Sequence, residues 1–113
     1  MRLHEKLDAL RLENSAVEIA TYLDIGSGTV LYASSSARVN QEILDNLCET
    51  VKTLLGEQDK DSNVALALRS TEALIVCRSS EDPSEAICLV CAPDVDVSSV
   101  LAAAEAAWTP EKA

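Results

Sequence analysis

Cys88 and Cys91 are the residues whose spacing most resembles a chemical site, because C-x-x-C pairs bind zinc or act as redox dithiols. Their surroundings argue against both functions. The segment Glu85 to Cys91 has the pattern of a strand, and strand residues three apart point to opposite faces. The sequence has no second C-x-x-C, and its single histidine is His4. We therefore interpret both thiols as buried side chains.

The other candidate motifs also lack essential parts. Gly26-Ser27-Gly28 has neither the third glycine nor the following helix of a dinucleotide loop, and it predicts a hairpin turn. Asp59, Asp61 and Asn63 resemble the first ligands of a calcium loop, but Val64 stands where that loop needs glycine. We find no nucleophile, base and orienting group together. The sequence therefore predicts no catalytic, metal or cofactor site, and we expect the protein not to be an enzyme.

Composition predicts a single folded domain over residues 1–113. The chain is 48% hydrophobic and 25% charged, and it contains no phenylalanine, so its core must be aliphatic. Four cysteines lie inside apolar patterns, and we interpret all of them as core thiols in a reducing compartment. They are Cys48, Cys77, Cys88 and Cys91.

The net charge of -10 argues against two classes of partner. Nucleic acids and anionic membranes are bound through clustered Lys and Arg, so we expect neither. The N-terminal residues 1–6 are interrupted by charges and lack the apolar stretch of a signal peptide or membrane span. These features favour a cytoplasmic protein.

The first third of the chain predicts a helix followed by a hairpin. Leu3, Leu7 and Leu10 recur at helical spacing, which indicates a short helix on which His4 is exposed. The segment 16–24 then alternates apolar and polar residues, as a half-buried strand does. The Gly-Ser-Gly turn leads back into a second strand over residues 29–34.

Residues from about Val39 to Leu55 carry the clearest helical pattern. Serines 34–36 could cap this helix, and Gly56 is a natural end for it. At about 100° per residue, seven apolar side chains fall within an arc of about 140°. They are Ile43, Leu44, Leu47, Cys48, Val51, Leu54 and Leu55. So wide an arc indicates either a deeply buried helix or one that contacts both its own sheet and a second copy.

Three strands and a helix complete the pattern. The strand 63–69 has a bulky face and a small face, whereas the strands 72–78 and 85–91 are apolar on both faces and should be central. Asp96 or Ser98 can cap a closing helix, which Trp108 would anchor on the sheet. We predict an α+β domain of order α-β-β-α-β-β-β-α, with a five-stranded, mainly antiparallel sheet and helices on both faces.

This element order and the hairpin resemble the roadblock/dynein light chain family. The hairpin that carries the resemblance runs from Glu18 to Ser34 and reads EIATYLDIGSGTVLYAS, in which a strand, an Asp, a glycine turn and a second strand ending in Ala-Ser follow one another. Longin and profilin-like domains have similar layouts. The resemblance implies an adaptor that dimerises by pairing its middle helices and the strands after them.

On this chain the implied interface comprises Ile43, Leu44, Leu47, Cys48, Val51, Leu54, Val64, Leu66 and Leu68. The resemblance further implies a non-enzymatic homodimer that binds a small Ras-like GTPase or another signalling or motor partner. The alternative is a secretion-type chaperone, because those proteins are also small, acidic and dimeric. A client peptide bound along a strand edge would distinguish the chaperone from the adaptor.

Overall fold

Five strands form one sheet in the order β2-β1-β5-β4-β3, and every neighbouring pair is antiparallel. The computed structural model describes residues 2–35, 38–57, 63–79 and 81–108. The acidic loop with Asp59 and Asp61, which we interpret as no calcium site, therefore lies outside the described residues. The elements are α1 (Leu3–Glu13), β1 (Val17–Asp24), β2 (Thr29–Ser35), α2 (Gln41–Glu57), β3 (Val64–Leu68), β4 (Ala73–Arg78), β5 (Glu85–Cys91) and α3 (Val97–Trp108).

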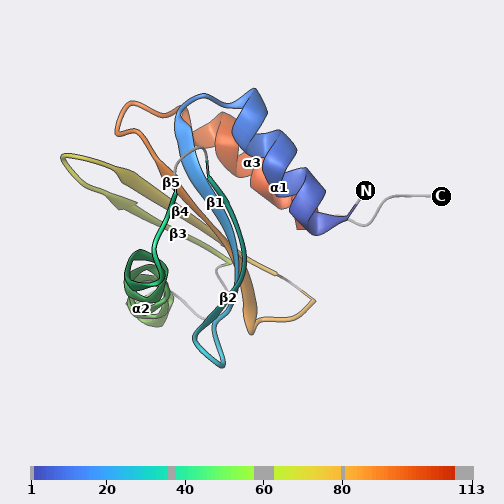
Figure 1. The fold of residues 1–113 in the computed structure, drawn as a ribbon, viewed down its shortest axis with the longest axis vertical. Helices are drawn as coiled ribbons and strands as arrows, with labels where there is room; N and C mark the ends of the chain where they lie inside the picture. The colour runs from blue at the N-terminus through green and yellow to red at the C-terminus, as the bar shows by residue number, and fades with distance from the viewer. Residues whose placement is uncertain (1, 36–37, 58–62, 80, 109–113) are drawn as a thin grey trace.

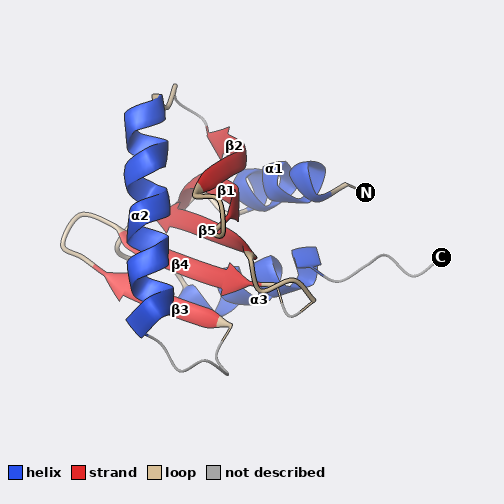
Figure 2. Cartoon of the chain, turned by 90° about the horizontal axis from the view of Figure 1, so that it is seen from below, coloured by secondary structure: helices blue, strands red, loops and turns tan. Residues whose placement is uncertain are grey.

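Helices cover both faces of the sheet, as the sequence predicts. In Figure 1, α1 and α3 lie side by side on one face, and α2 lies on the other. Figure 2 shows α2 running across the strands rather than along them. The α+β element order predicted from the sequence is confirmed.

Two separate cores hold these layers together, because β4 and β5 are buried on both faces. On the side of α1 and α3, Ile75, Ile87 and Leu89 pack against Leu7 and other side chains of the two helices. On the opposite side, a second cluster from β4 and β5 packs against the inner surface of α2. Its members include Leu47, Val51, Leu55, Leu74, Val76 and Cys88. Burial of both strand faces explains why neither strand shows polar alternation.

The cysteines confirm the strand interpretation of C-x-x-C. Cys88 lies in the core beneath α2, whereas Cys91 lies in the core beneath α1 and α3. All four cysteines of the chain are buried and unpaired with one another. Burial raises the pKa of the Cys88 and Cys91 thiols, which keeps them protonated and unreactive at neutral pH.

The ends of α2 differ from those predicted. Asn40 caps the helix, since its Oδ1 accepts a hydrogen bond from the Ile43 amide at 2.9 Å. Ser34 and Ser35 do not cap the helix as predicted, because they continue β2, and Ser36 lies outside the described residues. Gly56 does not end the helix, which runs to Glu57. A glycine in the last turn weakens a helix only modestly, so Gly56 does not stop this helix.

Polar side chains fasten α1 to the edge strand β2. The Tyr32 hydroxyl donates to Asp8 at 2.8 Å, and Arg11 Nε donates to the buried Ser34 hydroxyl at 2.8 Å. Hydrogen bonds from Ser34 and then Tyr32 lower the pKa of Asp8. His4 is only partly exposed, because its ring lies 5.5 Å from that of Tyr32.

Trp108 anchors the end of α3, as predicted. Its Nε1 donates to the Cys77 carbonyl of β4 at 3.1 Å, and its ring meets Tyr22 edge to face with centroids 5.8 Å apart. The Tyr22 hydroxyl in turn donates to Glu85. Burial and then this hydrogen bond raise the pKa of Tyr22 to about 12.

Replacing Trp108 with Phe should lower the free energy of unfolding by about 1 kcal/mol, because the hydrogen bond from the indole to the Cys77 carbonyl is lost while most ring packing remains. Denaturant unfolding followed by circular dichroism measures this change. Trp108→Ala should cost more, since it also removes the ring contact with Tyr22. Equal stability of Trp108→Phe and the parent would show that the indole hydrogen bond contributes nothing.

The two tyrosines of the chain should titrate above their usual pKa of 10.0, since each donates to a carboxylate that favours the neutral phenol. Because both pKa values are raised on folding, this stability is complete below pH 10 and is lost as pH rises through the folded values. Ultraviolet absorbance of phenolate reports the titration. Asp8→Asn should return Tyr32 towards pKa 10 and leave Tyr22 unchanged. A shift of both tyrosines would contradict the assignment.

Candidate interaction site at helix α2 and strand β3

The structure divides the apolar arc of α2 into an inner and an outer part. The inner residues are covered by the chain's own sheet: Leu47 is 7% exposed, Cys48 6%, Val51 0% and Leu55 8%. Leu44 and Leu54 are half-buried, and Ile43 is 47% exposed. The width of the arc therefore has two causes, since most of it fills the core and one flank reaches the surface.

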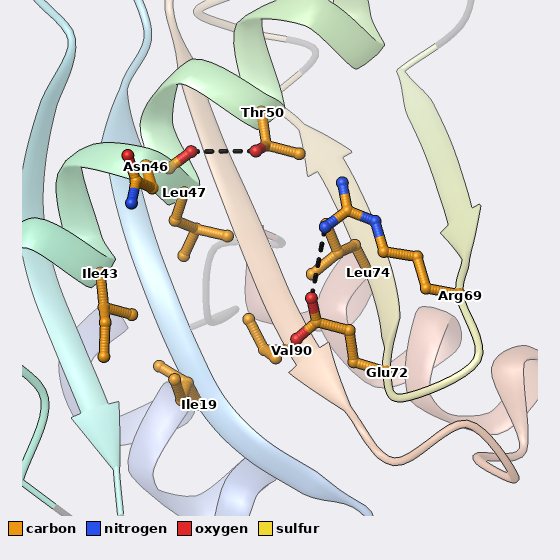
Figure 3. A pocket seen from close by; sticks show the side chains of 9 residues that line it. All are labelled: Ile19, Ile43, Asn46, Leu47, Thr50, Arg69, Glu72, Leu74 and Val90. Carbon is orange, nitrogen blue, oxygen red and sulfur yellow. Dashed lines mark hydrogen bonds and ion pairs between the residues drawn. The ribbon is translucent and has the colours of Figure 1, made fainter.

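That flank borders a groove of about 210 Å³ (Figure 3). Ile43 and Thr50 of α2 form one wall. Arg69 and Glu72, at the turn between β3 and β4, form the other wall and are paired at 3.3 Å. The apolar floor comes from three strands, through Ile19, Leu74 and Val90.

A second cavity of about 250 Å³ continues the groove along the same helix. It shares Thr50 and Arg69 with the first cavity and adds Thr53 and Leu54. The groove thus follows α2 from Ile43 to Leu54. Sequence reasoning missed Arg69, Glu72 and the floor residues, because their approach to α2 depends on how the sheet folds under it.

Strand β3 lies at the edge of the sheet and leaves one side of its backbone open. Arg69 donates its amide to the Glu72 carbonyl at 2.8 Å, and Arg78 donates to Asn63 at 2.6 Å. Hydrogen-bonded pairs alternate along an antiparallel ladder, so Ala65 and Ala67 also bond to β4. The amide and carbonyl groups of Leu66 and Leu68 therefore point away from the sheet. Among the described residues, no strand pairs with that side.

The predicted β3 residues lie on the face of the sheet opposite α2. Ala65 is 2% exposed and packs beneath α2 with Ala67, so the small face of the strand is the one that the helix covers. Strand alternation turns Val64, Leu66 and Leu68 to the other face. The α2 part and the β3 part of the predicted interface thus meet at one sheet edge without sharing a surface.

The outer surface of α2 is polar and mainly acidic. Its exposed charged residues include Glu42, Asp45 and Glu49, with Lys52 as a basic exception. The Thr50 hydroxyl donates a hydrogen bond to the Asn46 carbonyl at 2.9 Å. This donor is therefore satisfied, and the methyl group of Thr50 is left towards the groove. Across the part of the chain that the structure describes, no three His, Cys, Asp or Glu residues gather as metal ligands. None of the described helices is long and apolar enough to span a membrane.

Searches by sequence find no matching family model and no matching curated protein. Solved structures with the same fold do exist. A roadblock/LC7 domain from Streptomyces avermitilis superposes with a TM-score of 0.78 at 10% identity, over 96% of this chain and 92% of that one. The gliding protein MglB from Thermus thermophilus gives a TM-score of 0.72 at 21% identity, over 95% of this chain and 83% of that one.

A profilin solved with rabbit actin, LokiProfilin1, is also similar, with a TM-score of 0.58 at 11% identity over 94% of this chain and 90% of that one. The layout is therefore the roadblock/LC7 fold, which profilins share more distantly. This confirms the fold that the hairpin and element order predict. At these identities the likeness establishes the fold alone.

Leu47→Asp should unfold the single subunit, because it places a carboxylate in the core beneath α2. A buried, unpaired charge costs about 3–5 kcal/mol or more, a large part of the stability of a small domain. Ile43→Asp, on the exposed flank of the same helix, should leave the subunit folded. Thermal unfolding followed by circular dichroism compares the two variants. Similar melting of both would contradict the division of the arc.

Proposed function

We propose that this protein is a non-enzymatic regulatory adaptor that works as a homodimer in the cytoplasm. Support comes first from the open edge of β3, where the outward backbone groups of Leu66 and Leu68 can pair with another strand. The roadblock/LC7 fold adds to it. The open backbone edge of β3 is the main observation that supports the proposed homodimer.

In this proposal two β3 strands pair antiparallel across a twofold axis and join two sheets into one. Such an interface is isologous, so each strand offers the same groups to its copy. The helix α2 extends across the sheet to β3 (Figure 2), so pairing of the edges would bring the two α2 helices close together. The half-buried side chain of Leu54, which lies near Arg69 at the end of β3, would then lose further contact with water.

The proposed partner of the dimer is a small Ras-like GTPase or another signalling protein, as the roadblock resemblance implies. The joined α2 layer would present an acidic surface with an apolar groove, which is suited to a folded partner with basic residues. Purified Ras-like GTPases from the same genome, loaded with GDP or a GTP analogue, test this partner class in a surface-binding assay. No binding of either form at tens of micromolar would contradict it.

Leu66→Pro should convert the dimer to a monomer of 12.1 kDa at concentrations where the parent has twice that mass. Proline removes the outward amide of Leu66 but none of the bonds to β4, and edge strands tolerate it. Leu66→Gln is the matched control, because it keeps the amide and should remain dimeric. Light scattering coupled to size exclusion gives the masses. A monomeric parent at micromolar concentration, or a dimeric Leu66→Pro, would refute the edge pairing.

A further inference from the structure

The groove beside α2 consists of two neighbouring cavities of similar size. The first, of about 210 Å³, lies between Ile43 and Glu72 (Figure 3), and the second, of about 250 Å³, lies beside Leu54. Thr50 and Arg69 line both cavities. A cavity of about 150 Å³ already holds a benzene molecule. Each cavity therefore has room for one large apolar side chain.

The spacing of the two cavities matches that of alternate side chains in an extended chain. Helix α2 lines the first cavity from Ile43 to Thr50 and the second from Glu49 to Leu54. The midpoints of these two stretches are five residues apart, which is about 7.5 Å along a helix. Side chains i and i+2 of an extended segment point to the same side and lie about 6.8 Å apart. Two such side chains can therefore enter the two cavities of one groove.

The floor of the groove is apolar and recessed. Leu74 is 2% exposed and Val90 7%, because α2 borders them on one side and the pair of Arg69 and Glu72 on the other (Figure 3). A broad folded surface would contact the rim of such a groove, whereas side chains that project from a narrow segment can reach the floor. Ile43, which is 47% exposed at the rim, adds apolar surface that these side chains would cover.

The rim of the groove on α2 is acidic. Glu49 lines the second cavity, and Glu42 lies about two helical turns before it on the same side of the helix. Both side chains are exposed, and neither has an ion-pair partner among the described residues. On the opposite rim the charges cancel, since Arg69 pairs with Glu72 at 3.3 Å. The groove as a whole therefore carries negative charge.

The one basic residue in the sequence of α2 does not offset this charge. Lys52 reaches the turn between β1 and β2, where its Nζ lies 3.2 Å from the position that a Cβ on Gly28 would take. That turn contributes no residue to either cavity. The carboxylates of Glu42 and Glu49 are thus left to attract a cationic partner.

We propose that this groove binds an extended, basic segment of another protein, with apolar side chains i and i+2 in the two cavities and Lys or Arg residues beside them. This site goes beyond the proposed GTPase partner, because a single subunit forms all of it. It requires neither the proposed dimer nor a folded partner. It predicts one segment for each chain.

The probe for the test is a fluorescein-labelled peptide of about seven residues, which spans about 24 Å when extended, with Leu at its third and fifth positions and Lys elsewhere. At physiological ionic strength, anisotropy and calorimetric titrations should give one peptide for each chain. A peptide of the same composition with adjacent leucines should bind at least about tenfold more weakly, because only one leucine can then face the groove. Tighter binding of a peptide whose leucines are four residues apart, as in a helix, would overturn the extended segment.

A variant of the wall that both cavities share tests the place of binding. Thr50→Tyr should weaken binding at least about tenfold, because the larger side chain fills space that the leucines need. Thr29→Tyr is the matched control, since Thr29 is exposed on β2 and lines neither cavity. It should bind the peptide as the parent does. Circular dichroism should show that both variants are folded.

A second pair of variants tests the charge of the rim. Glu42→Gln/Glu49→Gln should weaken binding about threefold or more, because it removes two carboxylates beside the groove. Glu13→Gln/Glu81→Gln removes the same charge from exposed positions outside the groove and should have a smaller effect. Equal weakening by the two double variants would contradict the proposal, since general attraction to an acidic protein would then explain binding.

Unchanged binding by Thr50→Tyr, or equal weakening by Thr29→Tyr, would also overturn the proposal. So would a mass that falls from two chains to one in Thr50→Tyr, because a second copy would then occupy the groove. A dimer that does not bind the peptide would refute the peptide site and leave the proposed function intact. A monomeric parent that binds it would refute the proposed dimer alone.

Discussion

The need to bury both faces of β4 and β5 governs the rest of this structure. Side chains such as Ile75 and Leu74 are neighbours on one strand, yet they belong to the cores on opposite sides of the sheet. Neither face can remain in water, so helices must cover both. α2 supplies one cover, and α1 with α3 supplies the other. The remaining strands extend this sheet on either side until the helices no longer reach over it.

The two faces of β3 are covered to different extents by the helices that bury β4 and β5. Ala65 and Ala67 let α2 approach closely, and the larger Leu66 and Leu68 lie on the opposite face beyond the reach of α3. The strand is therefore half covered, with an open backbone edge and an exposed aliphatic strip. Edge strands of this kind pair readily unless charge, proline or a bulge prevents it, and β3 has none of these between Val64 and Leu68. This combination is the basis of the homodimer that we propose.

Polar interactions in the described residues serve mainly to fasten elements. Asp8, Tyr32, Arg11 and Ser34 tie α1 to β2, and Trp108 ties α3 to β4. These contacts hold α1 and α3 against the sheet whose other face forms the groove beside α2. The adaptor function that we propose depends on preformed surfaces more than on reactive groups, because preformed surfaces lose little conformational freedom on binding.

The sequence by itself determined the order of the elements, the turn at Gly26 to Gly28 and the double burial of β4 and β5. These features depend on local periodicity and turn chemistry, which act over a few residues. It also indicated that Cys88 and Cys91 point to opposite faces. It could not divide the arc of α2, since helical spacing alone does not say which flank the sheet will cover. Only the tertiary structure decided that Leu47 is core and Ile43 surface, that Asn40 caps α2, and that β3 turns its leucines away from α2. Those outcomes depend on contacts between segments far apart in the chain, where packing of whole layers outweighs local preference.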